Sequence, residues 1–296
     1  MMGHSCQFIG EQPEIMSEVR RIGPNVGLHE LGNPRSSFRF QLQFAKEQTE
    51  DILLNLNNLV KNTIDRAPMR EGEFCLDRKT NPLLTDEEDK WERAMYAKWG
   101  PGSLGEYVPV CKRIQAYQYP LQASRNDKCW GKIDLLGIGT DFLPVPNELK
   151  KREPVESPLR MLVEVAAYGF AIQKVWPNLK DDWGKALSRV EGAPLPFPAT
   201  LDKLTLVGVA PEEYWCQCLG RLPGVKKWKF PDGAWPSFWK LVDAFGKWFD
   251  IHFVAIEGSW EDAQQLPKIT GARVLKLRSL TLKSAADTPG SGNSRS

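Results

Sequence analysis

The stretch Lys132–Tyr168 constrains the fold more than any other part of this 296-residue chain. Two runs rich in Val, Leu and Ile are separated by Gly139-Thr140-Asp141, a sequence typical of a tight turn, and they predict two adjacent strands. Ser157-Pro158 is a strong start signal for a helix. The segment Leu159–Trp176 is apolar almost all round, which predicts a buried helix that ends at Pro177.

Three charged residues lie within the predicted strand pair. Asp134 is in the first apolar run, and Glu148 and Lys150 are at the end of the second. Since successive side chains of a strand point to opposite faces, Glu148 and Lys150 are expected on the same face, where Asp134 could meet them. Two carboxylates and one ammonium group at a strand end can hold a divalent cation and a water molecule.

The tripeptide D/E-x-K occurs three times in the chain, as Asp77–Lys79, Glu88–Lys90 and Glu148–Lys150, so the tripeptide alone is weak evidence. The first copy lies in a polar stretch, and the second is expected in a helix turn that faces solvent. Only the third ends an apolar run, follows a strand that carries an Asp, and precedes a predicted buried helix. This context favours a functional site over the alternative, an ion pair at a strand end on the surface.

These residues resemble a known family. Gly131–Asp134 followed by Glu148–Lys150 is similar to the PD-(D/E)xK nuclease superfamily, in which an Asp precedes a D/E-x-K tripeptide at a variable interval, here 14 residues. The segment Glu164–Tyr168 is similar to the Q-h-x-x-Y element of the exonuclease-V-like branch, with Glu in place of Gln. The resemblance covers about residues 107–180 and extends through the later strands to about residue 283. Residues 1–106 match no motif of the family.

The resemblance implies a nuclease that uses Mg²⁺ or Mn²⁺ to hydrolyse phosphodiester bonds in nucleic acid, with DNA as the expected partner. It implies that Asp134 and Glu148 are carboxylate ligands of the metal and that the backbone carbonyl of Leu149 completes the set. Lys150 would orient the attacking water or stabilise the charged transition state. Replacement of Asp134, Glu148 or Lys150 by Ala is therefore expected to abolish cleavage and to leave folding intact.

Further residues are expected near this site. In the family, the Gln and Tyr that match Glu164 and Tyr168 lie beside the metal. Glu164 could add a third carboxylate there, or it could pair with Arg160 one helical turn earlier. The family often adds a Glu from an earlier helix, and Glu92 and Glu106 are the two options. A solvated helix face is the favoured interpretation of Glu92.

The chain is predicted to have three parts. Residues 1–106 form a mostly helical extension that matches no motif, residues 107–283 form the nuclease-like core, and residues 284–296 form a disordered tail. Residues 1–35 of the extension are expected to be a loosely attached arm. The remaining elements predicted for the extension are a short strand at Phe38–Leu42 and helices at Glu47–Ile64 and Asp86–Lys98.

The core is predicted to be an α/β (α+β) fold with a mixed central sheet flanked by helices, as in restriction endonucleases. Pro144 and Pro146 cannot donate to a ladder, so regular pairing of that strand is expected only near Asn147–Lys150. The other elements predicted for the core are strands at Glu106–Leu121, Leu204–Ala210, Ile251–Ile256 and Val274–Lys283, and a helix at Pro236–Phe249.

Charge and composition exclude some classes of protein. The net charge of +2 excludes a strongly cationic coat for nucleic acid, although a local basic surface and a metal can still bind phosphate. No apolar run approaches the roughly 20 residues of a membrane span, and no secretory signal is seen. The six scattered cysteines are expected to be free thiols, so the chain is predicted to be cytoplasmic.

Two other classes of function remain open. The chain could be a catalytically inactive member of the nuclease fold that serves as a nucleic-acid- or protein-binding module. It could also be a structural protein whose acidic residues lie on the surface. An intact set of Asp134, Glu148 and Lys150 favours the nuclease, since a binding module does not need it. The residues do not decide between DNA and RNA, between endo- and exonuclease action, or between a monomer and a homodimer.

Overall fold

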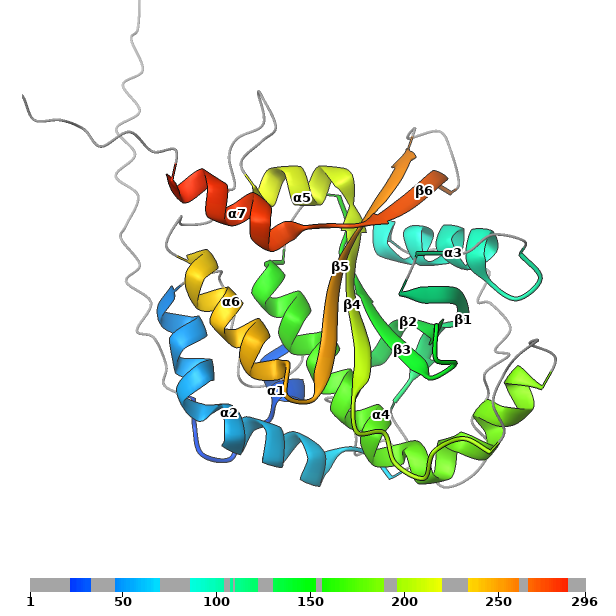
Figure 1. Cartoon of the computed structure of the whole chain (residues 1–296), viewed down its shortest axis with the longest axis horizontal. Coiled ribbons are helices and arrows are strands. Elements are labelled where there is room, and N and C mark those ends of the chain that lie inside the picture. The colour runs from blue at the N-terminus through cyan, green and yellow to red at the C-terminus, as the bar shows by residue number, and fades with distance from the viewer. Residues whose placement is uncertain are drawn as a thin grey trace, which may run out of the picture.

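The structure is a computed structural model of the chain. It describes residues 22–32, 46–69, 86–103, 107–108, 110–121, 130–152, 156–188, 196–219, 234–260 and 266–286. These residues form a mixed α/β fold, in which helices flank a six-stranded mixed sheet (Figure 1). The predicted α/β class is therefore confirmed.

The six strands lie side by side in the order in which they occur in the chain. They are β1 (Cys111–Pro120), β2 (Lys132–Gly139), β3 (Pro144–Leu149), β4 (Leu204–Pro211), β5 (Phe249–Ser259) and β6 (Lys268–Val274). β1, β2 and β3 pair antiparallel, β3, β4 and β5 pair parallel, and β6 pairs antiparallel with β5. The two strands predicted from Leu204–Ala210 and Ile251–Ile256 are confirmed as β4 and β5 in the parallel part of the sheet.

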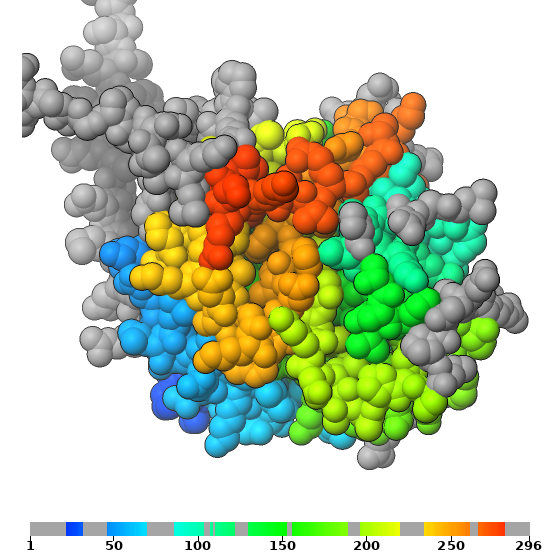
Figure 2. Space-filling view, viewed as in Figure 1, coloured from blue at the N-terminus to red at the C-terminus, as the bar shows by residue number. Residues whose placement is uncertain are grey.

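Helices cover both faces of this sheet. They are α1 (Leu28–Gly32), α2 (Lys46–Arg66), α3 (Glu87–Trp99), α4 (Pro158–Leu187), α5 (Glu212–Cys218), α6 (Ala234–Phe245) and α7 (Leu277–Ala286). α4 packs on β3 and β4 and also contacts α1, α2 and α6, whereas α3 packs on β1. Figure 1 shows α3 on the opposite side of the sheet from α4 and α6, and Figure 2 shows α2 and α6 as neighbours on the surface.

The alternation of strand side chains produces two apolar cores. On β2 and β4, Leu136 and Leu206 belong to the core shared with α4. Their neighbours Leu135 and Val207 belong to the second core, which includes Trp91 of α3. Because adjacent residues of a strand point to opposite faces, runs without polar residues are needed where both faces are covered. The central strands β2, β3 and β4 are therefore buried on both sides over most of their length.

α4 begins as predicted but does not end as predicted. Ser157 caps it, since its Oγ accepts a hydrogen bond from the Arg160 N–H at 3.2 Å. The helix continues through Pro177, and the predicted end there is wrong. An internal proline costs about 3 kcal/mol. Full burial of side chains such as Leu179 and Trp183 beyond it contributes roughly 1.5–3 kcal/mol each, which offsets that cost.

The expectation of a loosely attached arm is wrong for residues 22–32. Leu28 and Leu31 of α1 are buried, and the Leu28 N–H donates to Thr63 Oγ1 of α2 at 2.8 Å. α2 confirms the helix predicted there, and α1, α2 and α3 all pack on elements of the predicted core. The boundary at residue 106 stays a prediction.

β3 is regular over its whole length, so the expectation that pairing would be limited to Asn147–Lys150 is wrong. Pro144 pairs with Ile138 and Pro146 with Leu136 on β2. On its other side, β3 pairs with β4 only over Asn147–Leu149. The missing N–H groups of the prolines therefore interrupt no hydrogen bond to β4.

The strand predicted at Val274–Lys283 is also wrong, because β6 ends at Val274 and α7 follows. Leu277 and Thr281, four residues apart, are both buried, which suits one face of a helix. Thr281 Oγ1 accepts a hydrogen bond from the indole N–H of Trp239 at 2.9 Å. The predicted strand at Phe38–Leu42 and the tail beyond residue 286 lie outside the described residues.

Two expectations from composition can be compared with the structure. Cys111 and Cys218 are buried thiols rather than parts of a disulfide framework. Within the described ranges, we find no helix with the length and the apolar content that a bilayer span requires.

His29 of α1 makes the stability of the fold depend on pH. Its ring stacks on Trp130 with centroids 4.3 Å apart, and burial, followed by the charge of Arg66, lowers its pKa from 6.5 to about 4. Below about pH 6.5 the unfolded chain therefore binds a proton that the folded chain does not. The free energy of unfolding should be highest above this pH and should fall by about 2 kcal/mol between pH 7 and pH 5 through this group.

Denaturant unfolding of the wild type and of His29→Gln at both pH values measures this effect. The variant should be less stable at pH 7 but should lose the part of the pH dependence that His29 contributes. An equal fall in both proteins would contradict the assignment.

Candidate metal centre

The candidate site lies at the end of the sheet where β2 begins and β3 ends. Leu135 pairs with Asn147 in the antiparallel β2–β3 ladder. The next positions along the two strands, Asp134 and Glu148, therefore face each other. Lys150 follows β3 directly. The structure thus brings together the three residues that the sequence predicts.

Three carboxylates meet at this strand end. One oxygen each from Glu88, Asp134 and Glu148 lies within 4.8 Å of the other two, and we refer to these residues as the carboxylate trio. Such oxygens can bind one ion between them, because Mg²⁺ and Ca²⁺ ligands lie about 2.0–2.6 Å from the metal. Glu148 is buried, whereas Glu88 and Asp134 are half-buried. The trio is therefore partly accessible.

A backbone hydrogen bond fixes Asp134. Its Oδ2 accepts from the Leu149 N–H at 2.8 Å, just beyond the point where the β2–β3 ladder ends. The N–H and C=O of one strand residue point toward the same neighbouring strand. The Leu149 carbonyl therefore also faces β2, which is compatible with its predicted role as a ligand. That role stays a prediction.

Lys150 is buried among carboxylates. Its Nζ lies 2.5 Å from Glu148 Oε1, 2.7 Å from Glu156 Oε2 and 2.8 Å from Glu164 Oε2. Among the described residues, Nζ donates hydrogen bonds to Glu148 Oε1 and Glu164 Oε2, whereas its contact with Glu156 is an ion pair. Glu164 also accepts from Arg160 Nε at 3.0 Å. Of the two alternatives for Glu164, the pair with Arg160 occurs, whereas the third carboxylate beside Asp134 and Glu148 is Glu88.

Burial and the crowding of negative charge raise the pKa values of the trio. Burial raises the pKa of Glu88 to about 7. Burial and then the charge of Glu92 raise the pKa of Asp134, and burial and then Asp134 raise that of Glu148. Burial acts in the same direction on Glu164, yet Lys150 and Arg160 lower its pKa below the usual value. The charge of Lys150 therefore does not offset burial and crowding at the trio, whereas Lys150 and Arg160 together do so at Glu164.

The donor set fits a small hard cation. Glu148 Oε2 is buried and has no hydrogen-bond partner among the residues that the structure describes, which is costly for a carboxylate oxygen. A cation bound to the trio would satisfy this oxygen and would supply the missing charge. The trio offers only carboxylate oxygens, which suit Mg²⁺, Mn²⁺ or Ca²⁺ rather than zinc.

Glu88 was missed from the sequence, because the second D/E-x-K tripeptide was expected in a solvated helix turn. The structure places Glu88 in the trio instead. A signal was present in the spacing. Trp91 and Glu92 lie three and four residues after Glu88, and Met95 and Trp99 continue at the same helical spacing, so these residues share one face of α3, and all but Glu88 are buried.

The interpretation of Glu92 as part of a solvated face is wrong. Glu92 is only 3% exposed, and its Oε2 has no hydrogen-bond partner among the described residues. Burial and then the charge of Glu88 raise its pKa well above the usual value. Glu92 is therefore close enough to interact with Glu88 and Asp134, without belonging to the trio.

The other two predicted residues have different outcomes. Tyr168 lies at the site. Burial and then the charges of Glu148 and Glu164 raise the pKa of its hydroxyl. Glu106 lies outside the described residues, so its predicted role stays untested.

No protein-family model, curated protein or solved structure matches the chain in comparisons. The function therefore has to be argued from the donor set and the geometry of the site itself.

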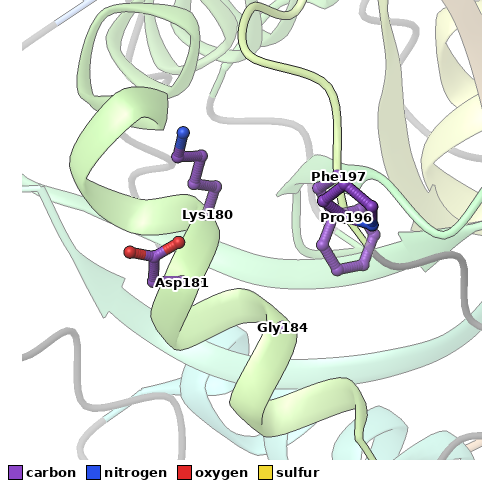
Figure 3. A pocket seen from close by; sticks show the side chains of 5 residues that line it. All are labelled: Lys180, Asp181, Gly184, Pro196 and Phe197. Atoms are coloured by element: carbon purple, nitrogen blue, oxygen red, sulfur yellow. The ribbon is translucent and has the colours of Figure 1, made fainter.

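A separate pocket of about 490 Å³ lies along the second half of α4 (Figure 3). Lys180 lies 16 residues after Glu164, which corresponds to about 24 Å along a helix. This pocket is therefore remote from the trio. Its lining residues are Lys180, Asp181, Gly184, Pro196 and Phe197.

Metal binding by the trio can be measured without any assumption about activity. In isothermal titration with Mn²⁺, the wild type should bind the ion, and Glu88→Gln, Asp134→Asn and Glu148→Gln should each weaken binding by about tenfold or more. Asp243→Asn is a matched control, because this exposed carboxylate pairs with Arg278 on another part of the surface. Unchanged affinity in all three trio variants would exclude the site.

Removal of Lys150 should destabilise the fold, which revises the expectation that folding would be unaffected. Lys150→Met leaves Glu148 and Glu164 buried without their ammonium partner, and loss of one partner of a buried pair costs about 3–5 kcal/mol. Lys185→Met is the control, since its ion pair with Asp182 is exposed on the lysine side. Denaturant unfolding compares the two. Equal stability of Lys150→Met and the wild type would contradict the network.

Proposed function

We propose that this protein is a Mg²⁺- or Mn²⁺-dependent nuclease of restriction-endonuclease-like fold that hydrolyses phosphodiester bonds in nucleic acid, with DNA as the expected substrate. The observation that carries the proposal is the carboxylate trio on adjacent strand ends, with the Lys150 ammonium on Glu148. This is the set that the resemblance to PD-(D/E)xK nucleases implies, and Glu88 adds the carboxylate from an earlier helix.

The residues of the trio have distinct roles in this proposal. Asp134 is held in place by the Leu149 N–H. Glu148 directs Oε1 to Lys150 and keeps Oε2 for the metal. Glu88 approaches from α3. A bound Mg²⁺ or Mn²⁺ would supply a Lewis acid that activates water and offsets charge on the phosphate.

Glu148 and Glu164 accept hydrogen bonds from Lys150, whereas Glu156 contacts it only as an ion pair, so Glu156 is the partner that a substrate can displace. Glu156 is the most exposed of the three, with 27% of its side chain accessible compared with 4% for Glu148 and 11% for Glu164. We infer that a phosphate oxygen of the substrate replaces Glu156. Lys150 then remains fixed by the two buried carboxylates and donates its third N–H to the phosphate.

The second candidate is a catalytically inactive protein of this fold that binds nucleic acid or protein. The three carboxylates around Lys150 favour it, because a lysine that keeps all three has its charge compensated before any substrate arrives. Cleavage assays separate the two candidates.

The test is incubation with linear and circular DNA, single- and double-stranded, in Mg²⁺, Mn²⁺ or a chelator. Cleavage should require the metal. Asp134→Asn and Glu148→Gln should each reduce the cleavage rate by about 100-fold or more, since each variant removes one proposed ligand of the metal. Asp243→Asn should cleave like the wild type. Full activity of Asp134→Asn would remove the assignment, and metal binding without cleavage of any substrate would favour the inactive binding module.

A further inference from the structure

A cluster of cations and aromatic rings lies beside the carboxylate trio. Trp260, which follows β5, has the guanidinium carbon of Arg152 4.7 Å from its ring centroid and the Lys90 Nζ 5.1 Å from it. Trp91 packs edge-on against the same indole, at 6.3 Å. The negative face of the indole attracts both cations and holds them in place. We refer to Trp260, Arg152 and Lys90 as the Trp260 cluster.

Arg152 is held in one orientation but keeps donors for a ligand. Its backbone N–H and its Nε donate to Glu87 Oε1 at 3.2 and 3.0 Å, and Trp91 Nε1 donates to the same oxygen. Within the described part of the chain, its two Nη groups donate to no side chain or carbonyl. A guanidinium fork fixed in this way suits a phosphate, which it can bind through two parallel hydrogen bonds.

The position of the cluster relates it to the trio. Glu87 immediately precedes Glu88, and Arg152 comes two residues after Lys150. Arg152 and Lys90 are half-exposed, unlike the buried Lys150. The cluster therefore supplies accessible positive charge next to an acidic site that would otherwise repel a polyanion.

We propose that Arg152 and Lys90 bind the phosphate backbone of a nucleic-acid strand next to the bond that lies at the trio. The substrate is then a polymer rather than a small phosphodiester, because only a polymer places a second phosphate on the cluster. This inference rests on the proposed function and specifies its substrate class.

The simpler interpretation is that Arg152 and Glu87 form a surface ion pair that stabilises the fold slightly. The two interpretations differ in one respect. An ion pair alone gives Arg152 no effect on nucleic-acid affinity, whereas a phosphate contact changes both the affinity and its dependence on salt.

The experiment uses Arg152→Gln, Lys90→Gln and a control that the chain itself provides. Arg278 stacks on Trp239 at 5.1 Å and pairs with Asp243, which repeats the arrangement of Arg152, Trp260 and Glu87 far from the trio. Arg278→Gln therefore removes an equivalent cation without affecting the proposed surface. Circular dichroism checks that each variant is folded. If the loss of the ion pair with Glu87 unfolds Arg152→Gln, Lys90→Gln alone tests the proposed phosphate contact.

Binding of a fluorescent single-stranded oligonucleotide is measured in a chelator, so that no cleavage occurs, between 50 and 200 mM salt, a range in which phosphate contacts strongly affect affinity. Each cluster variant should bind about tenfold more weakly, and the slope of log K against log salt should fall by about 0.7 for each lost contact. In Mg²⁺, both variants should lose activity on the oligonucleotide but should hydrolyse bis(p-nitrophenyl) phosphate like the wild type.

The outcomes are distinguishable. Wild-type affinity and slope in both cluster variants, or an equal loss in Arg278→Gln, would overturn the inference even if the protein cleaves DNA. If the wild type cleaves no substrate but the cluster variants still bind the oligonucleotide more weakly, the phosphate contact is supported and the proposed nuclease activity is overturned. Equal losses on the oligonucleotide and on the small diester would place the defect in the trio and would also overturn the inference.

Discussion

The burial of one ammonium group, that of Lys150, determines the arrangement of the whole strand end. A buried lysine is tolerated only when its charge is paired and its donors are satisfied. Here β3 supplies Glu148, the helix α4 supplies Glu164, and the segment before α4 supplies Glu156. The ammonium therefore ties the sheet to the helix that packs on it. The position of α4 and the geometry of the site cannot change independently.

Glu148 links this ion-pair network to the candidate metal centre. One of its oxygens contacts Lys150, while the other is buried beside Asp134 and Glu88 with no hydrogen-bond partner in the described part of the chain. A carboxylate held in this way is preorganised, because the lysine fixes its orientation before any ligand arrives. Positive charge on one side of Glu148 and unbalanced negative charge on the other give the site its polarity. Glu164, with Lys150 and Arg160 as partners, is part of the scaffold rather than of the trio.

The sequence predicted the parts of this site that depend on local periodicity. Asp134, Glu148 and Lys150 lie on consecutive strands, so alternation and a tight turn are sufficient to bring them together. Glu88 could not be placed in the same way, because α3 approaches the strand end through tertiary packing of Trp91 and Met95, which local pattern does not reveal. The same limit explains the errors at Pro177 and at α7. In both, burial against distant elements outweighed a local signal for a helix end or for a strand.

A net charge of only +2 leaves the chain without the general cationic surface that attracts nucleic acid at long range. Any phosphate contact must then come from individual cations that are held at fixed positions. Arg152 and Lys90 lie over the ring of Trp260, and Glu87 also accepts hydrogen bonds from Arg152. An aromatic ring orients a cation without neutralising it. Two cations oriented by one aromatic ring, Arg152 and Lys90, can therefore attract a polyanion to an acidic metal centre in a protein that is nearly neutral overall.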